Sequence, residues 1–140
     1  MADIRVETGV VTYNINEAFE VAFNPTDSAF VKRLFDAFDY LDKKQDAYKE
    51  EVDKISDKKK IFEISEARDK EMREIVDGVF NAPVCDAVFG CMNVYAYANG
   101  LPVWCNLMLA VMDEIDTTFA REQKATNARI AKYTQKYKIR

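Results

Sequence analysis

The chain contains no histidine, which limits the chemistry that its other polar residues could perform. Histidine is the commonest general base and the usual partner of a nucleophilic serine or cysteine. Glycine-rich phosphate loops are also absent, because Gly90 and Gly100 are isolated and no Gly-Lys-Ser/Thr string occurs. We therefore expect a protein that is not an enzyme, with no catalytic, cofactor-binding or metal-binding residues.

The three cysteines are the remaining candidates for metal or redox chemistry. Cys85 and Cys91 are too far apart to form a CxxC motif, and neither forms one with Cys105. Each has apolar neighbours in the sequence, where a free cysteine behaves as a small hydrophobe. Three cysteines cannot all pair within one chain, and the N-terminal sequence lacks the pattern of a secretory signal. The sequence therefore predicts buried structural cysteines and a cytoplasmic protein.

Acidic residues that share a helix face could in principle bind a metal ion. These pairs, however, alternate with cations along the chain, as in Arg68-Asp69-Lys70-Glu71. Such alternation is typical of ordinary ion pairs on a solvated helix face. We expect that role for the following pairs: Asp36 with Asp39, Glu63 with Glu66, and Glu71 with Glu74.

The elements that would position these residues are mainly helices. Segment 1–24 alternates polar and apolar residues and is rich in β-formers, with residues 16–18 as the connection between two strands. Pro25 and the capping residues that follow it precede a strong helical period. The pattern predicts a mainly α fold, a helical hairpin or a bundle of about four helices, with a short N-terminal β-hairpin.

The first helical stripe is strong up to Leu41 and becomes more polar beyond it, which indicates a coiled-coil-like arm. The stripe changes phase after Ile55, so a turn at 56–59 is favoured over a single helix of roughly 80 Å. Further helices are expected at 61–79, at 84–89 and from Pro102 onward, with a turn at 99–102. The predicted core residues are Leu34, Phe35, Phe38, Ile75, Val79, Trp104, Leu107, Met108, Val111 and Ile115.

Charge divides the chain into an acidic body and a basic end. Segment 124–140 carries six Lys or Arg and no acidic residue. Because the whole chain has a net charge of −4, the remaining residues have a net charge of about −10. We expect one domain at 1–123, followed by a basic C-terminal tail at 124–140 that frays. The most apolar window, 101–112, is too short to span a bilayer, so no membrane partner is expected.

Binding to another protein is the mode of action that this composition favours. Self-association is one form of it, because a basic tail suits an acidic neighbouring subunit. Nucleic acid is less favoured, although the tail interleaves tyrosines with lysines. The segment 91–98 could line a groove. The candidate partner-binding residues are Phe30, Leu34, Tyr48, Val52, Tyr95, Tyr97, Lys132, Tyr133, Lys136 and Tyr137.

Five segments carry a family resemblance: AFNPTDSAFVKRLFDAFDYLDKK, EARDKEMREIVDGVF, VCDAVFG, NGLPVW and DEIDTTFAREQKATNARIAKYTQKYK. With the β-rich start, they resemble a family of small proteins encoded in the tail-gene clusters of tailed phages and prophages of Gram-positive bacteria. The resemblance implies a tail assembly chaperone that binds tape-measure and tail-tube proteins in the bacterial host cell. The alternatives are a phage-encoded inhibitor of a host defence protein and a structural tail component.

Overall fold

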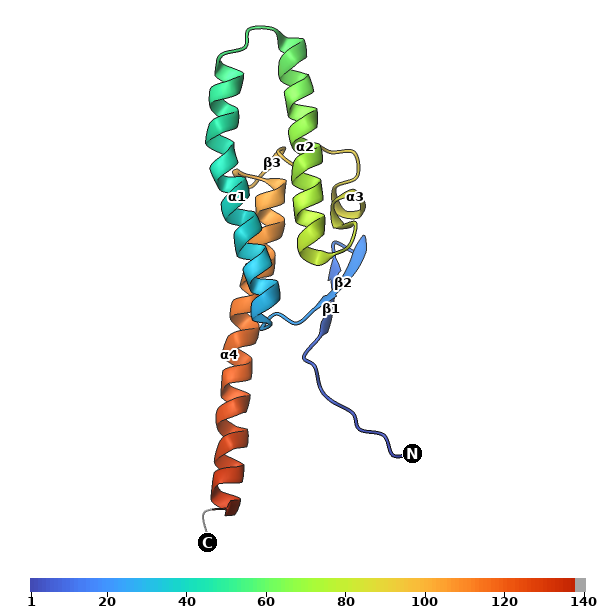
Figure 1. Ribbon diagram of the computed structural model, residues 1–140, viewed down its shortest axis with the longest axis vertical. Coiled ribbons are helices and arrows are strands. Elements are labelled where there is room, and N and C mark those ends of the chain that lie inside the picture. The colour runs from blue at the N-terminus through green and yellow to red at the C-terminus, as the bar shows by residue number, and fades with distance from the viewer. Residues whose placement is uncertain (138–140) are drawn as a thin grey trace.

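A computed structural model describes residues 1–137, with the backbone alone at 126–131 and 133–137 (Figure 1). Within this range it shows the predicted mainly helical fold of four helices and a two-stranded N-terminal hairpin. The elements in chain order are β1 (Val11–Ile15), β2 (Phe19–Phe23), α1 (Ser28–Asp53), α2 (Lys58–Phe80), α3 (Val84–Phe89), β3 (Tyr97–Ala98), β4 (Leu101–Pro102) and α4 (Val103–Tyr137).

Helices α1 and α2 form an antiparallel hairpin whose ends are set by local capping (Figure 1). The Asp27 carboxylate accepts a hydrogen bond from the Ala29 amide at 3.0 Å, and Asp57 accepts one from Lys59 at 3.0 Å. Both are preferred N-cap residues because they satisfy amides that have no partner inside the helix. Asn81 ends α2 in a left-handed conformation with φ of 54°. The turn at 54–57 therefore confirms the predicted hairpin.

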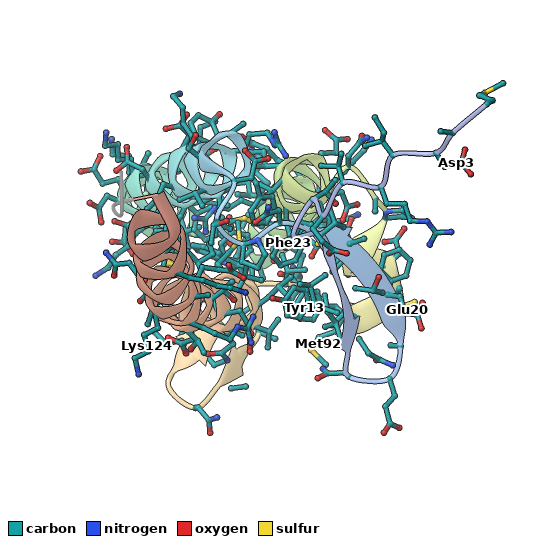
Figure 2. All side chains as sticks on the ribbon, turned by 90° about the horizontal axis from the view of Figure 1, so that it is seen from below. Asp3, Tyr13, Glu20, Phe23, Met92 and Lys124 are labelled. Carbon is teal, nitrogen blue, oxygen red and sulfur yellow. The ribbon has the colours of Figure 1, made fainter. Side chains whose placement is uncertain are left out.

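The N-terminal β-hairpin packs onto the helices through alternate residues of β2. Residues 16–18 connect the two strands, as predicted, and Asn16 and Glu17 both have positive φ there. Val21 and Phe23 are buried, and the Phe23 ring stacks on Phe30 with 4.3 Å between centroids. Seen from below, Phe23 points toward the helices whereas Glu20 lies on the outer side of the hairpin (Figure 2). The helices thus supply the apolar surface that an isolated hairpin lacks.

The core lies where α1, α2, α4 and the β-hairpin meet. The α1 stripe that enters it comprises Phe30, Leu34, Ala37 and Leu41. Phe35, which we expected in the core, is 53% exposed. It follows Leu34 by one residue and is therefore rotated by about 100° from the buried stripe. The other predicted core residues are buried, except Phe38 and Ile75, which are partly buried and pack against the core.

Residues 42–71, which we call the arm, lie beyond this core. The arm comprises the second half of α1, the turn and the first half of α2, and none of its residues is buried. Its inward-facing apolar side chains are only half-buried. These are Tyr48, Val52, Ile55, Ile61 and Ile64.

Helix α4 extends well beyond the body of the protein (Figure 1). Among the side chains described on this helix, the last buried one is Thr118, and residues 119–125 are all exposed. We expected the chain to fray from Lys124, but the helix continues to Tyr137. None of the helices described in residues 1–137 combines the length and the apolar character that a membrane span requires.

Two neighbouring α1 residues test the position of the core. Leu34→Ala should lower the free energy of unfolding by about 2–5 kcal/mol, because it removes a fully buried side chain. Phe35→Ala should cost less than about 1 kcal/mol, because that ring is half exposed. Urea denaturation of both variants measures the difference, and equal losses would contradict the helix phase described above.

Candidate functional site

An open cleft of about 540 Å³ lies beside the arm. Three parts of the chain line it: the second half of α1, one face of α2 and the loop that leads into α4. The cleft brings together four of the candidate binding residues, although they are far apart in the sequence. They are Tyr48 and Val52 on α1, and Tyr95 and Tyr97 in the loop.

Arg68 of α2 lies between two tyrosines at the edge of this cleft. Its guanidinium carbon is 3.5 Å from the centroid of the Tyr48 ring and 4.1 Å from that of Tyr95. The two rings are nearly parallel, at 15°, with centroids 6.3 Å apart. Each such cation–π contact contributes about 0.5–2 kcal/mol. The stack therefore joins α1, α2 and the loop at the base of the arm.

The polar atoms of this stack are partly cut off from water. Burial raises the pKa of Tyr95 to about 12, although the positive charge of Arg68 opposes the rise. The Nη2 atom of Arg68 is buried and has no hydrogen-bond partner among the described residues. A second cleft of about 300 Å³, between α1 and α2, is also lined by Tyr48 and Arg68. Tyr48 and Arg68 thus line both clefts.

Arg73 holds the loop that carries Tyr95. Its Nε donates to Asp69 at 3.0 Å and its Nη1 to Asp86 at 2.6 Å. Its Nη2 donates to the backbone carbonyls of Gly90 at 2.8 Å and Met92 at 2.6 Å. One guanidinium therefore connects α2, α3 and the loop, through charge-assisted hydrogen bonds that are stronger than neutral ones.

Two further α2 side chains fix the loop next to Tyr95. Asp69 accepts a hydrogen bond from the Val94 amide at 2.7 Å, and Ser65 Oγ accepts one from Asn93 Nδ2 at 3.0 Å. The Val94 side chain is fully buried. The backbone on both sides of this anchor is thereby held against α2, which sets the position of the Tyr95 ring in the cleft.

The expectation of a solvated ion-pair face is confirmed for Asp36 and Asp39 on α1 and for Glu71 on α2, which pairs with Lys44 at 2.9 Å, whereas two arginines of α2 have other roles. Lys32 pairs with Asp36 at 2.7 Å and Lys43 with Asp39 at 2.9 Å, with all four side chains exposed. By contrast, the side chain of Arg73 is 13% exposed. Arg68 forms no ion pair among the described salt bridges and stacks on tyrosines. The loop covers this face, and the spacing of charges within α2 gives no sign of it.

The remaining candidate binding residues do not join the cleft. Phe30 and Leu34 lie inside the core and contribute no exposed surface, so the expectation that they contact a partner is corrected. Lys132 is exposed on α4, far from the cleft along the chain. The side chains of Tyr133, Lys136 and Tyr137 lie outside the described residues.

The cysteines divide into two classes. Cys85 and Cys105 are buried as predicted, whereas Cys91 is exposed, contrary to expectation. Cys91 follows Gly90, which has a positive φ and turns the chain away from α3. Among the described residues, no group of three or more Cys, Asp or Glu is arranged to hold a metal ion.

Comparison with known proteins found no protein-family model, curated protein or solved structure that matches the chain.

Thiol labelling tests the cysteine environments. At pH 8 a thiol reagent should modify Cys91 quickly, and Cys85 and Cys105 only after denaturation. Both buried thiols have a raised pKa, which is about 11 for Cys105 because of its burial and the nearby Asp42 charge. Mass spectrometry of the labelled peptides identifies the sites, and Cys91→Ser should abolish the fast reaction. Rapid labelling of Cys105 would contradict the packing of α4.

Replacement of Arg73 tests the anchor of the loop. Arg73→Met keeps the apolar stem but removes every donor, so we expect a loss of about 2–3 kcal/mol in unfolding free energy. Lys32→Met removes an exposed ion pair and should cost about 0.5 kcal/mol or less. Trp104, the single tryptophan, packs against Tyr95, so its fluorescence should change in Arg73→Met alone. An unchanged spectrum and stability would show that the loop is held by other contacts.

Proposed function

We propose that this protein acts without catalysis, by binding a helical segment of another protein along its arm and the adjoining cleft. The observation that supports this best is the arm itself. Thirty consecutive residues, 42–71, contain no buried side chain, yet they present a row of half-buried apolar ones. An amphipathic partner helix could lay its apolar face against that row.

The chemistry around the cleft suits a protein partner. Its lining combines apolar and aromatic side chains, among them Val52 and Tyr97, with polar ones such as Gln45, Asp46 and Lys49. Protein interfaces are likewise a mixture of apolar and polar surface in which aromatic residues are enriched. Covering the half-buried side chains would contribute about 25 cal/mol for each Å² of apolar surface removed from water.

Together with the sequence resemblance, this surface leads us to propose a tail assembly chaperone of a phage. Its partners would be the tape-measure protein, which is long and helical, and the tail-tube subunits that it recruits. Such a chaperone works by stoichiometric binding, which requires an exposed apolar face on a protein whose remaining surface is charged. A helical hairpin with an uncovered arm meets that requirement.

Co-expression with the tape-measure protein of the same phage tests the proposal. The wild-type protein should keep the tape measure soluble and co-purify with it. Val52→Asp should weaken that complex about tenfold or more, because it replaces an apolar side chain of the half-buried row and of the cleft lining with a charge. Phe62→Asp is the matched control, since Phe62 is 67% exposed and belongs neither to that row nor to the cleft lining, the two surfaces at which we expect contact.

Three results would overturn the proposal. One is a soluble tape measure in the absence of this protein, and another is equal loss of binding in both variants. The third is a deletion phage that makes full-length tails and fails only on hosts that carry a particular defence system. That result would favour the inhibitor. Circular dichroism of both variants checks that the helices remain formed.

A further inference from the structure

Residues 1–8, which we call the N-terminal segment, extend away from the helices (Figure 1). All of them are exposed, and none belongs to a helix or strand. Two apolar side chains recur at alternate positions, Ile4 at 90% exposure and Val6 at 75%. The positions around them are charged: Asp3, Arg5 and Glu7. Because successive side chains of an extended chain point to opposite sides, the segment has one apolar and one charged side.

The point at which this segment leaves the hairpin is fixed by Asn24, which follows β2. Its Nδ2 donates to the Thr8 carbonyl at 2.7 Å, and its Oδ1 accepts from the Thr26 amide at 2.8 Å. Gly9 passes beside it with φ of 70°, and a Cβ there would lie 2.7 Å from Asn24 Nδ2. A glycine suits both the conformation and the close approach. The segment therefore leaves in a set direction, and Figure 2 shows Asp3 well away from the helices.

The β-hairpin has an unpaired edge along β1. The sheet has only two strands, so β1 pairs with β2 alone. Among the described hydrogen bonds, the backbone of Val11–Ile15 bonds only to β2 and to the hairpin turn. The outward backbone groups of β1 are therefore free to pair with another strand.

An open apolar cleft of about 240 Å³ lies beside this edge, between the hairpin and α4. Tyr13 and Ile15 of β1 are half-buried in its lining, and Ala110 of α4 is exposed there. The other apolar residues of its lining are buried: Val21, Phe23, Leu107 and Val111. In a sheet, every second side chain of an added strand lies on the same face as Tyr13 and Ile15. A third strand on β1 would thus place alternate side chains at this cleft.

We propose that two copies of this chain exchange their N-terminal segments, each adding its segment as a third strand to the β1 edge of the other copy. Ile4 and Val6 then enter the cleft beside Ala110, and the charged side remains in water. Strand addition of this kind gains affinity from backbone hydrogen bonds and specificity from alternate side chains.

The second copy is the occupant because one chain carries both halves of the contact and cannot join them itself. A turn back onto its own β1 edge would break the Asn24 bond, which holds Thr8 against the chain that follows β2. Neither the arm nor the cleft beside it takes part, so the inference is independent of the proposed function.

Two variants of the segment test the exchange. The double variant Ile4→Asp with Val6→Asp should self-associate about tenfold or more weakly than wild type, because it places charges in an apolar cleft. Arg5→Asp is the matched control, since it changes the net charge by the same amount on the charged side and should pair as wild type. These three positions are exposed, so circular dichroism should show unchanged helix content in both.

A variant of the cleft completes the test. Ala110→Arg fills the cleft from an exposed position of α4 and should also abolish self-association. The double variant keeps an open cleft, and Ala110→Arg keeps an intact segment. Their mixture should therefore form a heterodimer through one contact, although neither variant pairs with itself.

Sedimentation over a range of concentrations measures these masses, and hydrogen exchange locates the contact. In the wild type, protection of residues 2–8 and of β1 should rise together with the dimer fraction. A wild-type monomer at millimolar concentration would overturn the proposal, as would equal dimerisation of the double variant and Arg5→Asp, or a mixture that stays monomeric. Protection of residues 2–8 that is independent of concentration would show that the segment occupies its own cleft. Protection that appears only when a tail-tube or tape-measure protein is added would assign the edge to that partner.

Discussion

The guanidinium of Arg73 is the contact on which the candidate site depends. The loop after α3 has little regular structure, so its carbonyl groups need donors from elsewhere, and Arg73 supplies them to Gly90 and Met92. The same group is held in place by Asp69, whose other oxygen accepts from Val94. Although burial lowers the pKa of Arg73, the carboxylates of Asp69 and Asp86 raise it on balance, so the charge is retained. Together with the hydrogen bonds of Asp69 and Ser65, Arg73 therefore holds Tyr95 beside Arg68, where it lines the cleft.

That anchor also separates a packed region from an open one. Below it, residues of α1, α2 and α4 fill a continuous core that includes Leu34, Met72 and Trp104, all fully buried. Above it, the arm is held by the stack on Arg68 and by an exposed pair of Lys44 with Glu71, 2.9 Å apart. Exposed pairs add little stability. We therefore expect the arm to be among the least stable regions of the protein. Local opening is easiest in such regions, and binding surfaces are often found there. An arm that opens without unfolding the core can adapt to a partner helix.

The sequence predicted the features that local rules decide. Asp27, Asp57 and Asn81 set the helix ends through bonds to residues a few positions away, and such bonds leave a readable pattern. The burial of Phe35 was predicted wrongly, because apolar character alone does not resolve a helix phase when two bulky residues are adjacent. The roles of Arg68 and Arg73 could not be predicted. Apart from Asp69, their partners lie in loops or on other helices 13 to 27 positions away, and a charge that contacts a loop has the same local spacing as one that contacts water.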